Sequence, residues 1–174
     1  MTALKGCMAP ASAAEDQLDQ GYAWVTVAGS FLTHVQCLGT VYTFTLYLES
    51  YASDFRVSLG VAALPGSLSV GMMLACGPFV GALIDKLGAR PVCLGLALCH
   101  GVGLLLISAC ETPLLLIAAH ALSGVGMSMA PASIGIIQQW FSKRRALATG
   151  LGIAGSGVGQ FVFAQIINAL ISAG

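Results

Sequence analysis

Residues 81–91 read GALIDKLGARP, and they place three charged side chains, Asp85, Lys86 and Arg90, within six positions. Long apolar runs lie on both sides of this stretch. Charged residues make up only 8% of the 174-residue chain, whereas soluble domains carry roughly 25%. A charged, glycine-rich island between two apolar runs indicates a short polar loop that joins two membrane spans.

The rest of the composition agrees with a membrane protein. Hydrophobic residues make up 57% of the chain and the mean hydropathy is +0.88. Each apolar run is long enough to cross a bilayer core of about 30 Å as a helix, at about 1.5 Å per residue. Helices are expected because strands would leave unpaired edges in lipid. The sequence therefore predicts an all-α membrane protein, a multi-span helical bundle with spans at about 22–47, 61–84, 91–110, 114–138 and 146–172.

The positions of the cations predict the orientation. Cytoplasmic loops of membrane proteins carry an excess of lysine and arginine. If residues 1–20 form a short cytoplasmic tail, only Arg56 among the seven lysines and arginines lies outside. The cations that then face the cytoplasm are Lys5, Lys86, Arg90, Lys143, Arg144 and Arg145. A net charge of zero gives no basic excess for binding nucleic acid.

The first span carries polar residues in steps of three and four, which draws a stripe down one helix face. The stripe consists of Thr26, Ser30, Thr33, Gln36, Thr40, Thr43 and Tyr47. Two interpretations remain open: the stripe hydrogen-bonds neighbouring helices, or it lines a water-filled cavity. Its length favours the cavity.

Other spans show signs of close packing and of one kink. Pro131 removes a helix hydrogen bond and predicts a kink in the fourth span. Gly77 and Gly81 in the second span are four residues apart, a spacing that permits close helix approach. The fifth span repeats this spacing with Gly152, Ser156, Gln160, Ala164 and Asn168.

Three histidines, His34, His100 and His120, are the only ionisable side chains well inside the spans other than cysteine and tyrosine. Such groups are costly in a membrane and are functional hypotheses by default; the alternative is a neutral histidine bonded to a neighbouring helix. His100 lies on a span that otherwise faces lipid. The chain contains no catalytic nucleophile–base set and no C-x-x-C pair, so neither an enzyme nor a metal or cofactor site is predicted.

Three stretches together resemble a known family. GALIDKLGARP fits the loop between spans two and three of the major facilitator superfamily, G-x-x-x-D-[RK]-x-G-x-[RK], at Gly81, Asp85, Lys86, Gly88 and Arg90. DQGYAWV, residues 19–25, is similar to the stretch that opens the first span of monocarboxylate transporters. WFSKRRALATGLGIAGSGVG, residues 140–159, is similar to the stretch that leads into their fifth span.

This resemblance implies a carrier of small organic anions such as monocarboxylates, or of similar solutes, with or without a proton. Family members that carry lactate with protons have a lysine within span one, whereas Tyr42 lies near that position here. Substrate-contact candidates are Thr33, Gln36, Thr40, Tyr42, Thr43, His120 and Gln160, with Arg144 and Arg145 at the inner mouth. Both arginines also have a simpler interpretation, which is that they hold their loop in the cytoplasm.

The resemblance also implies what lies outside these five spans. The superfamily has twelve spans in two halves, with the substrate held between them near the midplane. The loop of residues 81–91 is then a gating motif that latches the first half against a helix of the second. The expectation is the N-terminal part of a plasma-membrane transporter that works by alternating access. The alternative is a five-span binding or assembly subunit without transport activity of its own.

Overall fold

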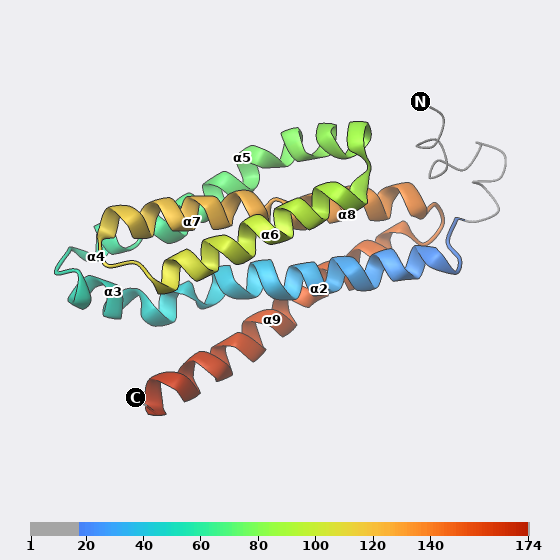
Figure 1. The fold of residues 1–174 in the computed structure, drawn as a ribbon. Coiled ribbons are helices and arrows are strands. Elements are labelled where there is room, and N and C mark those ends of the chain that lie inside the picture. The colour runs from blue at the N-terminus through green and yellow to red at the C-terminus, as the bar shows by residue number, and fades with distance from the viewer. Residues whose placement is uncertain (1–17, 174) are drawn as a thin grey trace.

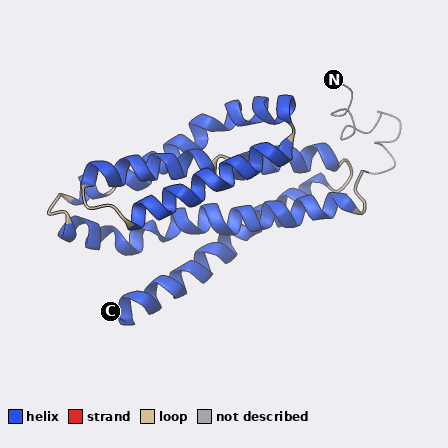
Figure 2. Cartoon of the chain, in the orientation of Figure 1, coloured by secondary structure: helices blue, strands red, loops and turns tan. Residues whose placement is uncertain are grey.

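The computed structural model describes residues 18–173, and in that range every element is a helix (Figures 1 and 2). The predicted all-α class is confirmed. Most of the predicted cytoplasmic tail, residues 1–17, lies outside the described residues. The helices are α2 (Tyr22–Thr43), the 3-10 helix η2 (Phe44–Tyr47), α3 (Leu48–Asp54), α4 (Leu59–Ala62), α5 (Leu64–Leu87), α6 (Ala89–Ser108), α7 (Pro113–Met127), α8 (Met129–Trp140) and α9 (Arg145–Ala173).

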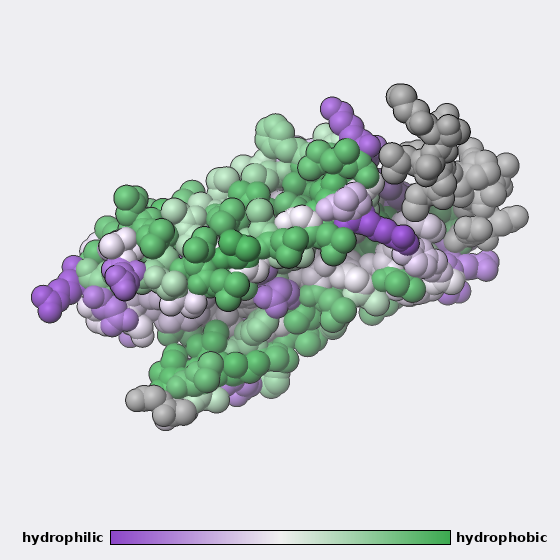
Figure 3. Space-filling model, in the orientation of Figure 1, coloured by the Kyte–Doolittle hydropathy of each residue, from purple (hydrophilic) through white to green (hydrophobic). Residues whose placement is uncertain are grey.

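Four helical segments in the described range are long and apolar enough to cross a membrane: Leu59–Leu87, Ala89–Ser108, Pro113–Trp140 and Arg145–Ser172. They overlap the second to fifth predicted spans. α2 is 22 residues long but is not among the four, because the polar stripe lowers its hydropathy. Hydrophobic side chains cover the length of the visible face and hydrophilic ones gather mainly at its two ends (Figure 3), as expected of a bundle that lies in lipid.

The turn between α5 and α6 explains why the charged stretch contains a glycine at position 88. Gly88 has a φ of 89°, a left-handed conformation that glycine adopts without steric cost. Its N–H donates to the carbonyl of Ile84 at 2.8 Å, which ends α5 and allows α6 to begin one residue later. Gly88 therefore makes the reversal short enough to keep both helices long.

The predicted kink in the fourth span is present, and it lies at Ser128 between α7 and α8 rather than at Pro131 itself. A proline ring clashes with the carbonyl four residues earlier. For Pro131 that residue is Met127, the last residue of α7. The fourth span is therefore two helices joined at Ser128.

Glycines let several pairs of described helices come into close contact. A Cβ built on Gly155 or Gly159 of α9 would lie within 3 Å of the α2 backbone at Phe31 or Val35. On the other helix pairs, Gly103 of α6 faces Ser123 of α7 in the same way. α2 lies between α9 and α8, and the last turns of α9 diverge from the bundle (Figure 1).

The glycine predictions hold for only part of their residues. In α9, Gly152 packs on α2 as predicted. The other close contacts with α2 come from Gly155 and Gly159, which were not in the predicted set, whereas Gln160 of that set is exposed. A Cβ at Gly81 would meet nothing within 4 Å, and one at Gly77 would meet only a side-chain atom of Pro131, at 3.9 Å. Among the described residues Gly77 and Gly81 therefore leave a helix surface open rather than pack tightly.

Candidate functional site

Most hydroxyls of the polar stripe on α2 donate hydrogen bonds to backbone carbonyls of the same helix. The hydroxyls of Thr33, Thr40 and Thr43 each donate to the carbonyl four residues earlier, at 2.9, 2.7 and 2.9 Å. Ser30 instead reaches another helix, because its Oγ lies 2.8 Å from the Oγ of Ser133 in α8. The stripe thus makes one interhelical hydrogen bond. Its threonine hydroxyls donate within α2, and their oxygen lone pairs can still accept a hydrogen bond.

The predicted contact residues of α2 differ in exposure. Thr43 is buried, with 2% of its surface exposed. Thr33, Gln36 and Thr40 are partly buried, whereas Tyr42 is 48% exposed. These side chains do not converge on one point of the helix.

A pocket of about 240 Å³ lies between α2, η2, α5, α6 and α7, near the end of the bundle that carries α3 and α4. We call it the outer pocket. It brings together two of the predicted contact residues, Thr40 and His120, while the other seven do not line it. Its wall includes Thr40, Phe44, Tyr47, Ser69, His120 and Ser123.

His120 is 5% exposed and forms part of this wall. Its ring packs edge to face against Phe44 and Tyr51, with ring centroids 5.6 and 6.3 Å away. Its Nδ1 lies 3.0 Å from the carbonyl oxygen of Leu116. The carbonyl of His120 in turn accepts a hydrogen bond from Ser69 at 2.9 Å, which ties α7 to α5 beside the pocket.

The other two histidines occupy different places. His34 is buried, and its Nδ1 lies 2.8 Å from the carbonyl oxygen of Ser30. His100 is 3% exposed, with its Nδ1 2.9 Å from the Oγ of Ser123. α6 presents His100 to α7 at Gly126, which agrees with the alternative interpretation of a histidine bonded to a neighbouring helix. Its apolar neighbours in sequence gave no signal of this contact.

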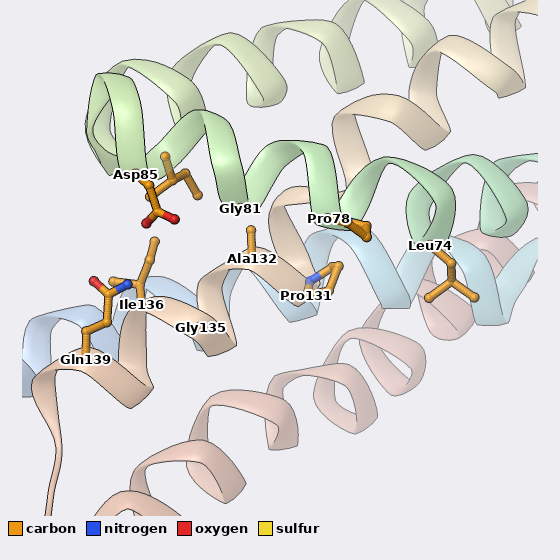
Figure 4. Close-up of a pocket in the computed structure, with 11 residues that line it drawn as sticks. Leu74, Pro78, Gly81, Asp85, Pro131, Ala132, Gly135, Ile136 and Gln139 are labelled. Carbon is orange, nitrogen blue, oxygen red and sulfur yellow. The ribbon is translucent and has the colours of Figure 1, made fainter.

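At the end of the bundle that carries the α5–α6 turn, which we call the motif end, a second opening of about 400 Å³ separates α5 from α8. Its wall includes Gly77, Pro78, Gly81, Asp85, Pro131 and Gln139. Figure 4 shows Asp85 on α5 and Gln139 on α8 opposite one another across this cleft. Two residues of the gating motif, Gly81 and Asp85, thus line a space, while Lys86 and Arg90 lie exposed beside it.

Also at the motif end, Asp19 fastens the start of α2 to the loop before α9. Its carboxylate accepts backbone N–H bonds from Ser142, Lys143 and Arg144 at 3.3, 3.0 and 2.9 Å. The Asp19 N–H donates to the carbonyl of Trp140 at 3.1 Å. The N–H of Lys143, followed by that of Arg144, holds the pKa of the Asp19 carboxyl below its usual range, because both bonds favour the ionised form.

Aromatic pairs reinforce this connection, which we call the Asp19 clasp. Tyr22 packs against Trp140 with ring centroids 5.6 Å apart, and Trp24 packs against Phe141 at 5.1 Å. The hydroxyl of Tyr22 also accepts a hydrogen bond from Arg90 at 3.3 Å. The start of α2 is therefore in contact with the loop before α9 and with the first turn of α6.

Both predicted arginines lie at this end. Arg144 gives its backbone N–H to the clasp and its side chain is exposed. The Nε of Arg145 donates to the carbonyl of Phe141 at 2.8 Å. Gln160 lies farther along α9, exposed and away from both openings.

Comparison with protein families gives the geometry its context. The family model described as "Major Facilitator Superfamily" matches residues 29–174, most of the chain. The chain belongs to the major facilitator superfamily. The open α5–α8 cleft and the motif loop beside it are therefore features of a transporter-family bundle.

Individual members of the superfamily show where the chain is similar. It is 33% identical to human monocarboxylate transporter 14 over 156 residues, which is 88% of this chain and 30% of that protein. It is 34% identical to monocarboxylate transporter 9 of Gallus gallus over 156 residues, 88% of this chain and 31% of that protein. It is 30% identical to the MFS-type transporter pynF of Aspergillus niger, over 86% of this chain and 35% of that protein.

The chain spans about a third of the length of these superfamily members. The three stretches that carried the resemblance meet at the motif end. Asp19 begins residues 19–25, and its carboxylate accepts hydrogen bonds from Lys143 and Arg144 of residues 140–159. Tyr22, also in residues 19–25, accepts a hydrogen bond from Arg90 of residues 81–91. The three stretches therefore contact one another in the fold, which separate motif matches do not show.

Proposed function

We propose that this chain forms part of the N-terminal half of a secondary transporter that carries small organic solutes across a membrane by alternating access. The observation that carries the proposal is the superfamily match over residues 29–174. Membrane-length helices with an open cleft at one end and a pocket towards the other are consistent with it. No covalent chemistry is needed for this function.

The similarity to monocarboxylate transporters 14 and 9 supports monocarboxylates as the solute class. We propose small organic anions, moved with or without a proton, as cargo. Thr40 and His120 are the two predicted contact residues that the structure brings together, in the wall of the outer pocket, and they stay candidates for solute contact. The remaining candidates stay proposals: Thr33, Gln36, Tyr42, Thr43 and Gln160 for solute contact, and Arg144 and Arg145 for attracting an anion at the motif end.

We propose that the motif end faces the cytoplasm of a cell whose plasma membrane holds the protein. Lys86, Arg90 and the three cations of residues 143–145 lie at or next to the two helix connections at that end, and Arg56 lies at the other end. Such an asymmetry orients membrane proteins. A topology reporter fused before residue 18 should report a cytoplasmic location.

We further propose that the transporter needs spans besides those described here. The chain covers about a third of its relatives' length, and the α5–α8 cleft offers a glycine-lined surface to another helix. In this proposal Asp85 and Gly81 meet that helix, and α2 is the first of five spans in this chain. The alternative, a binding or assembly subunit, requires no further spans.

Two measurements test the function. Sequencing of the transcript beyond the codon for Gly174 should recover a continuing reading frame with six or seven more apolar runs. Cells that express the whole frame should then take up members of a labelled carboxylate panel, measured with and without a pH gradient. A stop codon in a well-covered transcript, together with surface expression but no uptake, would favour the subunit instead.

Asp85→Asn should lower uptake by about two- to thirtyfold without preventing membrane insertion. The neutral amide loses the charge that Asp85 presents to the cleft and to helix amides or cations that reach it. Uptake normalised to surface protein measures the effect. Glu49→Gln, a change of the same kind on exposed α3, is the control, and equal uptake by both variants would contradict the role of Asp85.

A further inference from the structure

The walls of the outer pocket combine aromatic and aliphatic surface with one titratable nitrogen. We propose that this pocket binds a small uncharged aromatic solute that carries an N–H or O–H donor, and that Nε2 of His120 accepts that hydrogen bond. The proposal concerns binding by this pocket and stands apart from transport, since an uncharged solute bound here is distinct from the anionic cargo of the proposed function.

The hydrogen bond at Nδ1 fixes the role of the other nitrogen. A backbone carbonyl only accepts, so Nδ1 of His120 must carry the proton that it shares with Leu116. In a neutral imidazole with its proton on Nδ1, Nε2 is an acceptor. The ring therefore offers a lone pair on the side away from its own helix turn.

Nε2 of His120 is open to a ligand. No described residue donates to it or accepts from it. Within the described residues, the only side-chain nitrogen or oxygen that is both fully occluded and without a partner is Nε2 of His100. Nε2 of His120 therefore retains contact with open space, and the space that His120 lines is the outer pocket. A donor that enters this space can therefore reach the lone pair of Nε2.

The charges around the pocket exclude a permanently ionised ligand. None of the residues that line it is lysine, arginine, aspartate or glutamate. The titratable groups that face His120 are Tyr47, which shares the wall, and Tyr51, whose ring touches the imidazole; α5 and α6 contribute only hydroxyls and aliphatic groups there. An anion would lose its hydration without gaining a fixed cation, which is unfavourable.

The shape of the wall favours a small ring. Phe44 and Tyr47 lie perpendicular to one another with centroids 5.4 Å apart, and both line the pocket. Aromatic faces and edges in this arrangement accommodate a further ring by offset or edge contact. The volume of about 240 Å³ lies below the range of about 300–1,000 Å³ typical of drug-sized ligands, so the solute is smaller than these.

Indole is a suitable probe because its N–H is a donor only, and 1-methylindole has the same ring without the donor. With the chain in lipid nanodiscs, and empty nanodiscs subtracted, equilibrium dialysis at about pH 8 should show indole binding about tenfold more tightly than 1-methylindole. At about pH 5 the imidazole is protonated to a larger extent and Nε2 becomes a donor. The preference for indole should then fall.

Two substitutions identify the nitrogen. His120→Phe keeps a ring but removes the acceptor, and should make indole and 1-methylindole bind equally. His34→Phe is the matched control, since His34 is equally buried and its Nδ1 meets the same type of carbonyl, but it does not line the pocket. It should retain the preference for indole. If His120→Phe fails to fold, the indole comparison and its pH dependence in the unmodified chain still test the proposal.

Three outcomes would overturn the inference. The first is equal binding of the two indoles by the unmodified chain, and the second is loss of the preference in His34→Phe but not in His120→Phe. The third is tighter binding of benzoate than of indole, strengthening as the pH falls, which would mean that protonated His120 receives an acid. None of these outcomes depends on uptake, so the transport proposal can fail or survive separately.

Discussion

A chain with alanine at both Gly155 and Gly159 is expected to lose the close contact between α2 and α9. Each new Cβ would lie 2.8 or 2.9 Å from a backbone carbon of α2, at Val35 or at Phe31. Backbone atoms cannot move aside as a flexible side chain does, so the two helices must separate. Overpacking of this kind costs about 1–3 kcal/mol at each position, which outweighs the gain of about 1 kcal/mol from replacing glycine in a helix.

Gly157→Ala is the matched control for this pair. It lies on the same helix between the two positions, and a Cβ there would meet nothing within 4 Å. This variant should be neutral or slightly stabilised. Unfolding of the purified chains in mixed micelles, followed by helical circular dichroism, measures the difference, and equal unfolding midpoints for the double variant and the control would show that α9 does not pack as described.

Asp19→Ala is expected to release the loop that precedes α9. Three backbone N–H groups lose their acceptor at once, and hydrogen bonds to a charged group are stronger than neutral ones. Hydrogen exchange at the amides of Ser142, Lys143 and Arg144 should accelerate by about tenfold or more. Amides in the middle of α6, which the clasp does not touch, should be unchanged and serve as the internal control.

The clasp should also depend on pH in a defined direction. The pKa of Asp19 is lowered from 3.8 by its backbone partners. A depressed pKa in the folded state means a contribution that is present above the unfolded value and lost as the pH falls through the folded value. Protection of these amides should therefore be constant from neutral pH to about pH 5 and weaken only below about pH 4. A decline between pH 7 and pH 5 would contradict the role of Asp19.

The sequence was sufficient for features that depend on local pattern. Apolar runs predicted where the long helices lie, because length and hydropathy are properties of one segment. Pro131 predicted the kink, although the break falls at Ser128 because a proline disturbs the residues before it. The match at Gly88 also has a local cause, since the positive φ belongs to the turn itself.

Features that depend on pairs of helices were harder to predict. Gly81 and Gly159 occur in similar small-residue patterns, but only Gly159 meets another described helix. The sequence neighbours of His100 are lipophilic and give no sign of Gly126, the residue on the next span that His100 packs against. The α2 threonines satisfied an amphipathic pattern, yet their hydroxyls bond their own backbone. In each case the missing information was which face the neighbouring helix covers.

The break at Ser128 has a consequence for the fourth span. The outer pocket takes His120, Ser123 and Met127 from α7, whereas the α5–α8 cleft takes Pro131 to Gln139 from α8. The two openings are thus built on separate helices of the same span, which meet at Ser128. A substitution on α8 can therefore reshape the cleft at the motif end without changing any side chain that α7 contributes to the outer pocket.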